Sequence, residues 1–469
     1  MYKTYADVKA ALEKGLSVKD ILQTYLQAIE ERKDLNAFTE VFLDSAILKA
    51  QEVDQKLAEG KAGKLAGMVI AIKDNICYKN HKVSASSKIL EGFESIYSAT
   101  VVERLLAEDA IIIGRTNCDE FAMGSSNENS AFGPVRNALN EDYVPGGSSG
   151  GSATAVAANL CTVSLGSDTG GSIRQPASFT GTIGLKPTYG RVSRYGLIAY
   201  ASSFDQIGPF ANAVEDIALV TQVMAGIDEF DSTLSSKEVG SLLPTKLDRK
   251  LKIAYIRETL DSDGIDPEIK QRIEQLINCL RADGHELIPV SFPYLDKMVP
   301  TYYVLTTAEA SSNLSRFDGV HYGYRSKDAV GVDATYIQSR TEGFGSEVKR
   351  RIMTGTFVLS HGYYDAYYSK GQKVRRLIQD KTNEILANSD VILLPTSPTT
   401  AFKLNSVKEP IQMYLQDIFT VQANLAGNPA ISLPIGLHSN GMPFGLQLIG
   451  EQFEEKKLMD ISAYLNDFC

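Results

Sequence analysis

The chain has 469 residues, of which 43% are hydrophobic and 22% are charged, so it is long enough to bury a large core and has an ordinary globular composition. Its formal net charge of −10 argues against a surface dominated by nucleic-acid binding, because phosphate binding needs clustered lysine and arginine. The sequence has no apolar run of about 18 residues, so no membrane span is expected.

The cysteines and histidines of the chain are scattered, and none of them has the spacing of metal ligands. They are Cys77, Cys118, Cys161, Cys279 and Cys469, and His81, His285, His321, His361 and His438. An odd number of unclustered cysteines is typical of free thiols in a reducing compartment, so we expect a cytoplasmic protein without a bound metal.

Apolar periodicity predicts an alternation of helices and strands along the chain. Residues from about 5 to 58 have helical periodicity, with Ser17 in the position of an N-cap. The later elements are expected as strands at 68–72, 110–114, 161–165, 252–256, 286–290, 391–394 and 430–434, and as helices from 100, over 153–160, 212–225 and 267–282, and over about 370–388 and 411–425.

This alternation favours an α/β fold in which helices cover both faces of a β-sheet. A polar connector at about 228–250 is the candidate domain boundary of the chain, but strand–helix alternation resumes after it. We therefore expect one large domain over 1–469, with an N-terminal helical segment of about 1–60, a core of about 66–230, and a remainder of about 250–469 that completes the same domain.

Two glycine-serine-rich segments, 145–152 and 167–174, are the most informative feature of the sequence. Glycine tolerates backbone angles that other residues do not reach, and it leaves N–H groups uncovered. Loops of this kind hold an oxyanion or a phosphate.

Four chemistries compete for these loops. A phosphate cradle requires GxxxxGK[ST] or GxGxxG, and neither occurs. The nucleophile-elbow pattern GxSxG matches twice in overlapping frames, at Ser148 and at Ser149, but no downstream histidine is nominated as its partner. Asp168-Thr169-Gly170 is half of an aspartic-protease motif and has no second half. A Ser–Ser–Lys arrangement, the fourth possibility, needs no histidine.

Lys73 is the natural lysine for that fourth arrangement, because it ends the apolar strand expected at 68–72. Burial disfavours an ammonium, so the pKa of Lys73 should fall and its neutral amine can act as a base. A lysine at a strand end also commonly reaches solvent, and serine in a glycine-rich turn is commonly only a turn residue. Ser172 differs from an ordinary turn serine, because the uncovered N–H groups of Gly170 and Gly171 lie beside its hydroxyl.

The chain resembles the amidase signature family in three places taken together: Lys73, the run 146–152 and the run 168–176. The signature covers about residues 66–196, and the similarity extends over nearly the whole chain. The resemblance implies a central mixed β-sheet and amide hydrolysis by a Ser–cis-Ser–Lys triad. It assigns Ser172 as the acyl-forming nucleophile, Ser148, after a cis peptide, as the proton relay, and Lys73 as the base. The oxyanion hole then maps to the backbone N–H groups of Thr169, Gly170, Gly171 and Ser172.

Within the family, the chain is most similar to one branch, the glutaminase subunits of tRNA-dependent amidotransferases. This similarity is carried by stretches 117–125, 190–196, 309–314 and 343–351. The resemblance implies that glutamine is hydrolysed here and that ammonia passes to a kinase/amidotransferase B subunit, which amidates glutamate on mischarged tRNA. ATP and Mg²⁺ are expected on that partner and no cofactor in this chain. A small C subunit is expected to wrap this chain, and tRNA is expected to bind mainly through the B subunit.

Glutamine recognition maps by the same resemblance to Tyr302, Arg351 and Asp417. An arginine can clamp the α-carboxylate of glutamine, and an aspartate can pair with its α-ammonium. Arg350 adjoins Arg351, Tyr303 adjoins Tyr302, and Asp417 can also be a surface carboxylate. Two other functions stay open: a free-standing amidase for another small amide, with the same triad and no partner, and a catalytically silent scaffold.

Overall fold

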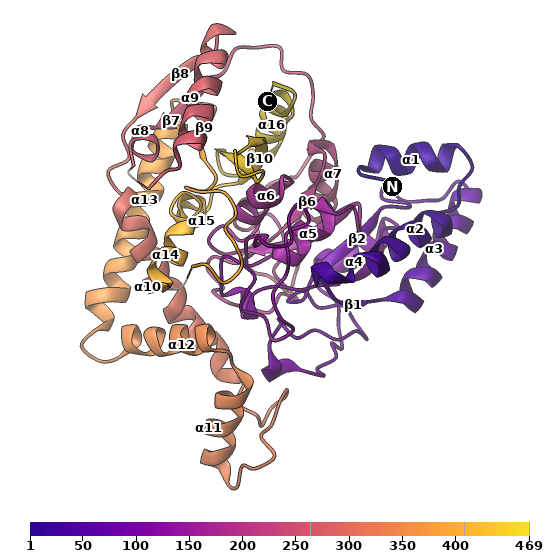
Figure 1. The fold of residues 1–469 in the computed structure, drawn as a ribbon, viewed down its shortest axis with the longest axis vertical. Coiled ribbons are helices and arrows are strands. Elements are labelled where there is room, and N and C mark those ends of the chain that lie inside the picture. Colours follow the sequence, from indigo (N-terminus) through magenta and orange to yellow (C-terminus); the bar gives the residue numbers. More distant parts are fainter. Residues whose placement is uncertain (263, 408, 469) are drawn as a thin grey trace.

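A computed structural model describes residues 1–262, 264–407 and 409–468 (Figure 1). Within the described residues, one 11-stranded sheet runs through the molecule in the order β1-β3-β2-β4-β6-β5-β10-β11-β9-β7-β8. The strands are β1 (Phe38–Val41), β2 (Val69–Lys73), β3 (Ile111–Thr116), β4 (Val163–Asp168), β5 (Ile183–Lys186), β6 (Gln206–Ala211), β7 (Lys252–Ile256), β8 (Glu286–Val290), β9 (Val391–Pro395), β10 (Ala430–Leu437) and β11 (Pro443–Ile449).

The sheet is mixed, as expected. Strands β3, β2 and β4 pair in parallel near one end, β9, β7 and β8 pair in parallel near the other, and the strands between them pair antiparallel. The antiparallel strands β6, β5, β10 and β11 therefore join two parallel α/β halves into one continuous sheet. The predicted α/β class is confirmed.

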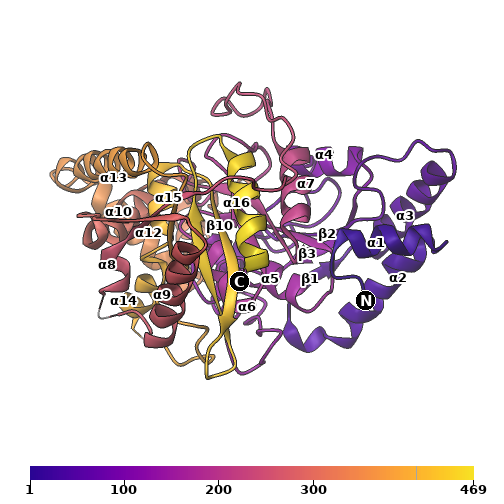
Figure 2. The ribbon, with the colours of Figure 1, turned by 90° about the horizontal axis from the view of Figure 1, so that it is seen from above.

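Helices flank this sheet. They are α1 (Tyr5–Glu13), α2 (Val18–Glu31), α3 (Leu43–Ala58), α4 (Thr100–Ala107), α5 (Gly150–Ala157), α6 (Arg174–Thr180), α7 (Val214–Met224), α8 (Arg257–Leu260), α9 (Pro267–Ala282), α10 (Leu295–Asn313), α11 (Val332–Gly343), α12 (Ser346–Leu359), α13 (Lys370–Leu386), α14 (Pro410–Tyr414), α15 (Val421–Ala426) and α16 (Glu455–Phe468). Seen from above, α1–α3 lie at one end of the molecule, and α9, α10, α12 and α13 lie at the other (Figure 2).

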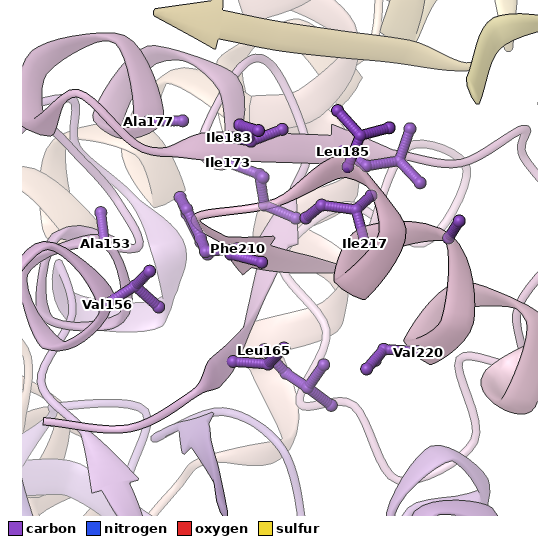
Figure 3. Packing of buried hydrophobic residues seen from close by; sticks show 14 of the residues in the cluster. Ala153, Val156, Leu165, Ile173, Ala177, Ile183, Leu185, Phe210, Ile217 and Val220 are labelled. Atoms are coloured by element: carbon purple, nitrogen blue, oxygen red, sulfur yellow. The ribbon is translucent and has the colours of Figure 1, made fainter. Parts of the chain in front are cut away.

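The centre of the sheet is packed between helices. Figure 3 shows Phe210 of β6 between side chains of α5, which include Val156, and side chains of α7, which include Ile217. All three residues are fully buried. Buried apolar area of this kind contributes about 25 cal/mol per Å² to stability, so this packing holds the ends of the central strands in place.

Ser17 caps α2 as the sequence predicts. Its hydroxyl accepts the N–H of Asp20 at 3.1 Å, and the Asp20 carboxylate accepts the N–H of Ser17 at 3.2 Å. This reciprocal capping box satisfies donors that a helix start leaves unpaired. The N-terminal segment is not continuous helix, however, because the short strand β1 interrupts it and pairs antiparallel with β3.

The single helix expected at about 411–425 is wrong. The structure breaks it into α14, a 3₁₀ turn at Leu415–Asp417, and α15. The carbonyl of Phe419 accepts the Gln447 side-chain amide at 2.8 Å, and the carbonyl of Thr420 accepts the Arg174 guanidinium at 2.8 Å. Because tertiary donors take these carbonyls, the carbonyls are not available for hydrogen bonds within one continuous helix.

Among the described residues, Cys77, Cys118, Cys161 and Cys279 are free thiols, and Cys469 lies outside that part of the chain. None of the described helices is long and apolar enough to cross a membrane. The same residues form no group of three or more metal-binding side chains.

Candidate active site

Lys73 is the last residue of β2, which lies parallel to β4 in the sheet. Because the carboxyl ends of parallel strands meet at one edge, Lys73 reaches the loop that follows β4. Its side chain is fully buried, and Nζ lies 2.7 Å from Ser148 Oγ, 2.9 Å from Ser149 Oγ and 2.9 Å from Ser167 Oγ.

Burial is the largest influence on the Lys73 amine, and it lowers the pKa of Lys73 to about 8. The nearby carboxylates of Asp119 and Asp168 oppose this effect without cancelling it. At pH 7 about a tenth of the amine is therefore neutral and able to accept a proton, and this fraction rises to about half at pH 8.

Ser148 lies on the first glycine-serine loop, directly after a cis peptide bond between Gly147 and Ser148, as the family resemblance implies. The loop is packed so closely that a Cβ at Gly147 would lie 2.1 Å from an Asp119 carboxylate oxygen. Only glycine fits there. The Ser148 carbonyl accepts the N–H of Asp119 at 3.0 Å, which ties this loop to the end of β3.

Ser172 lies on the second loop, just beyond β4, and is 8% exposed. The two loops touch, because the Ser172 carbonyl accepts the N–H of Ser149 at 3.2 Å. The Ser172 hydroxyl has no hydrogen-bond partner within the described part of the chain. The contact of Lys73 with Ser148 is thus formed, whereas a hydrogen bond between the hydroxyls of Ser148 and Ser172 is not.

The Asp168 carboxylate fixes the shape of the Ser172 loop. It accepts the N–H groups of Gly171 at 2.9 Å and Ile173 at 3.1 Å, and it forms an ion pair with fully buried Arg174. Burial alone would raise the pKa of Asp168, but the Arg174 charge lowers it to about 2. Of the four loop N–H groups expected to face an oxyanion, that of Gly171 already donates to this carboxylate.

Arg351 projects from α12 into a buried aromatic cluster. Its side chain is 5% exposed, whereas that of Arg350 is 49% exposed, so Arg351 is the arginine that can bind a ligand inside the protein. The guanidinium donates to Tyr200 Oη at 2.9 Å and to Glu347 Oε1 at 2.9 Å. It also lies 5.1 Å from the centre of the Tyr303 ring.

Asp417 lies beside the same aromatic cluster and is not the surface carboxylate that the sequence left open. Its carboxylate accepts hydrogen bonds from Ser125 Oγ at 3.0 Å and Tyr303 Oη at 3.3 Å. Burial raises the pKa of Asp417 to about 7, although the charge of Arg351 lowers it. Both groups thus contact Tyr303: the Arg351 guanidinium lies near its ring, and the Asp417 carboxylate accepts from its hydroxyl.

Tyr302 joins this cluster to the catalytic loop. A Cβ at Gly170 would lie 2.4 Å from Cζ of Tyr302, so the ring rests directly against the loop backbone. Thr420 makes a second link, because its hydroxyl donates to the Gly170 carbonyl at 2.7 Å and its N–H to the Asp417 carbonyl at 3.0 Å. Tyr302 and Thr420 therefore link the residues around Asp417 to the backbone of the Ser172 loop at Gly170.

The site also holds four residues to which the sequence assigned no role in a Ser–Ser–Lys site: Ser149, Ser167, Asp168 and Thr420. The first three lie within the two glycine-serine segments, where their polar character was visible. Thr420 lies in the segment expected to be helical, and nothing in the local sequence indicated its contact with Gly170.

Glu347, the ion-pair partner of Arg351, also lines a cavity of about 500 Å³. The other walls come from segments 128–132 and 342–346, together with Lys88, Glu91 and Glu120.

Comparison with known proteins agrees with this geometry. The profile of the family described as Amidase matches residues 20–459. The chain belongs to the amidase family. The signature resemblance is thereby confirmed, and the chain is an amidase-signature enzyme.

Amidase-family relatives cover almost the full chain. The glutamyl-tRNA(Gln) amidotransferase A subunit of Chlorobaculum tepidum is 52% identical, over 99% of this chain and 98% of its own. The crystal structure of the glutamyl-tRNA(Gln) amidotransferase A subunit from Thermotoga maritima is 41% identical with a TM-score of 0.78, covering 96% of this chain and 93% of that one. The peptide amidase of Stenotrophomonas maltophilia is 30% identical with a TM-score of 0.82, covering 99% and 96%.

Proposed function

We propose that this amidase-family chain is the glutaminase subunit of a glutamyl-tRNA(Gln) amidotransferase. Relatives named as the A subunit of that enzyme are about half identical to it along their full length. The observation that carries the proposal is the pair of buried charges, Arg351 and Asp417, next to the Ser172 loop. A site for an aryl or acyl amide has no use for two buried charges, whereas a free amino acid presents one group to each.

In the proposed complex, the Arg351 guanidinium binds the α-carboxylate of glutamine and Asp417 binds its α-ammonium. Tyr302 borders the substrate between these charges and the catalytic loop. Held at one end in this way, glutamine extends its side-chain amide toward Ser172. An ammonium beside Asp417 favours the ionised carboxylate, so glutamine binding lowers the pKa of Asp417 from its value of about 7.

The chemical steps follow from the order of the three side chains. The neutral Lys73 amine takes the proton of Ser148, Ser148 takes the proton of Ser172, and Ser172 attacks the amide carbon. Backbone N–H groups of the loop stabilise the oxyanion, with Thr169, Gly170 and Ser172 as the candidate donors. The relay returns a proton to the leaving nitrogen, ammonia departs, and water attacks the acyl ester to release glutamate.

The remaining parts of the reaction belong to the partners in this proposal. A B subunit holds ATP and Mg²⁺, activates the glutamate on tRNA and receives the ammonia, and a small C subunit wraps this chain. The acidic balance of the chain is consistent with tRNA binding mainly to the B subunit. We place the complex in the cytoplasm.

The test is amidation of glutamyl-tRNA(Gln) by the complex assembled from this chain and its co-expressed partners. We expect glutamine to support amidation, and Ser172→Ala to abolish that activity while added ammonium salt still supports it. Glutamine-dependent amidation that persists in Ser172→Ala would refute the nucleophile. A wild-type complex that amidates only with ammonium would refute glutamine as the donor and would favour a free-standing amidase.

A further inference from the structure

Lys73 contacts more hydroxyl groups than a three-residue triad requires. Besides Ser148, its Nζ lies 2.9 Å from Ser149 Oγ and 2.9 Å from Ser167 Oγ. All four side chains are at most 1% exposed. A buried amine must direct each of its hydrogen atoms at an acceptor, so these extra contacts constrain how the amine is oriented.

The hydrogen-bonding capacity of Ser149 is completely used. Its hydroxyl donates to the Ser167 carbonyl at 3.1 Å, and its oxygen accepts the N–H of Ser167 at 3.3 Å and the Lys73 amine at 2.9 Å. A hydroxyl has one hydrogen and two lone pairs. Because the hydrogen of Ser149 is engaged elsewhere, Ser149 can only accept from Lys73.

Ser167 is constrained from the other side. Its oxygen accepts the Asn75 side-chain amide at 2.9 Å and the Lys73 amine at 2.9 Å, which fills both lone pairs. Asn75 lies in the turn that follows β2, so the turn after Lys73 and the end of β4 both fix this hydroxyl. Ser167 is therefore a second acceptor in a fixed position.

We propose that Ser149 and Ser167 are positioning residues that aim the lone pair of neutral Lys73 at Ser148. A neutral amine has two hydrogens and one lone pair in a tetrahedral arrangement. Ser149 and Ser167 take the two hydrogens, so the remaining position faces Ser148, at 2.7 Å the nearest of the three hydroxyls. This inference rests on the proposed roles of Lys73, Ser148 and Ser172.

The same two hydroxyls affect the protonated form. An ammonium has three hydrogens, and in this site it donates to all three serines. Removing one acceptor destabilises the ammonium more than the neutral amine, so the pKa of Lys73 falls further. The loss of either hydroxyl therefore has two signatures: a slower reaction at high pH, and an acid limb that moves to lower pH.

Ser164 offers a matched control. It lies on the same strand β4 and is fully buried like Ser167, but its hydroxyl has no hydrogen-bond partner among the described residues. Ser164→Ala removes the same atom from the same strand without touching Lys73. Ser167→Thr keeps a hydroxyl at the position under test.

The experiment measures the rate at which a small alkyl fluorophosphonate labels Ser172 as a function of pH, in the full-length chain, with the labelled residue located by peptide mass spectrometry. The probe needs an activated serine but no glutamine site. For Ser149→Ala and Ser167→Ala we expect a plateau rate lower by about 10- to 100-fold and an acid limb at lower pH. Ser164→Ala should match wild type, and Ser167→Thr should recover most of the rate.

Wild-type pH profiles in both alanine variants would overturn the inference, as would an equal loss in Ser164→Ala. A lower plateau with an unmoved acid limb in both variants would also overturn it, because it would indicate a general packing defect. If the wild-type probe labels a residue other than Ser172, the proposed nucleophile fails and the inference fails with it. Labelling at Ser172 with unaltered variant profiles would leave the proposed function intact and reject only the positioning role.

Discussion

The two halves of the active site are built in different ways. The catalytic half, around Lys73, Ser148 and Ser172, comes from the ends of neighbouring strands and two short loops close together in the sequence. The proposed substrate half gathers Arg351 from α12 and Asp417 from a 3₁₀ turn. The chemistry of the site is thus encoded in short contiguous motifs, whereas its choice of substrate is encoded in tertiary packing.

The two halves also differ in how they hold charge. Lys73 is surrounded by hydroxyl groups, and burial brings its pKa down to about 8. Asp417 is buried beside an arginine and a tyrosine, and its pKa rises to about 7. Two groups of opposite type therefore titrate near neutrality; in the proposed function, Lys73 takes part in the chemical step and Asp417 in substrate binding.

The largest effect is expected from a substitution in the catalytic half. Lys73→Met removes the base, so glutamine hydrolysis should fall by about 10³-fold or more, mainly in kcat. Steady-state glutaminase assays measure this. Ammonium-dependent amidation by the same complex serves as the control and should persist, since it bypasses Ser172.

A change in the substrate half should act on binding. Arg351→Lys loses the planar fork that clamps a carboxylate, so KM for glutamine should rise by about 10- to 100-fold, with a smaller change in kcat. Arg350→Lys is the matched control, because that neighbouring side chain is half exposed and should leave KM unchanged. An equal effect of both substitutions would remove Arg351 from the binding site.

The pH dependence of binding sharpens the comparison further. In the proposed complex, Asp417 pairs with the substrate ammonium only when its carboxylate is ionised, so KM for glutamine should rise as the pH falls below about 7. Asp417→Asn should give a high KM that no longer varies over this range. Measuring KM across the pH range tests this, and a wild-type KM that is flat through pH 7 would contradict the assignment.

The smallest expected effect concerns Tyr303. Its hydroxyl donates to Asp417 at 3.3 Å and stabilises the ionised carboxylate. Tyr303→Phe should therefore raise the pKa of Asp417, moving the rise in KM to higher pH by less than about one unit. The fluorophosphonate labelling rate of Ser172 should not change, which separates this effect from any disturbance of the catalytic half.

The same division explains what the sequence could predict. Strand β7, helix α9 and strand β8 agree with the predicted bounds, because each has clear periodicity between turn signals. Strands β1, β5, β6 and β11 were not predicted; glycine or proline lies within β5, β6 and β11, so they lack the uninterrupted apolar run that marked β2 and β9.

In the site, Lys73 and the two serine loops were visible because glycine-rich turns constrain the backbone locally. The burial of Arg351, the exposure of Arg350, and the contact of Thr420 with Gly170 depend on segments far apart in the chain. Only the folded structure distinguishes Arg351 from Arg350, because the local sequence does not indicate which side of α12 packs inward.

The measurement that tests the account most directly is the pH dependence of Ser172 acylation in wild type and in Lys73→Met. If the neutral Lys73 amine activates Ser172 through Ser148, the wild-type rate should rise through about pH 8 to a plateau, and Lys73→Met should lose both the rise and the rate. A wild-type rate that does not vary between about pH 6 and 10, or a Lys73→Met variant that retains the wild-type profile, would contradict the account.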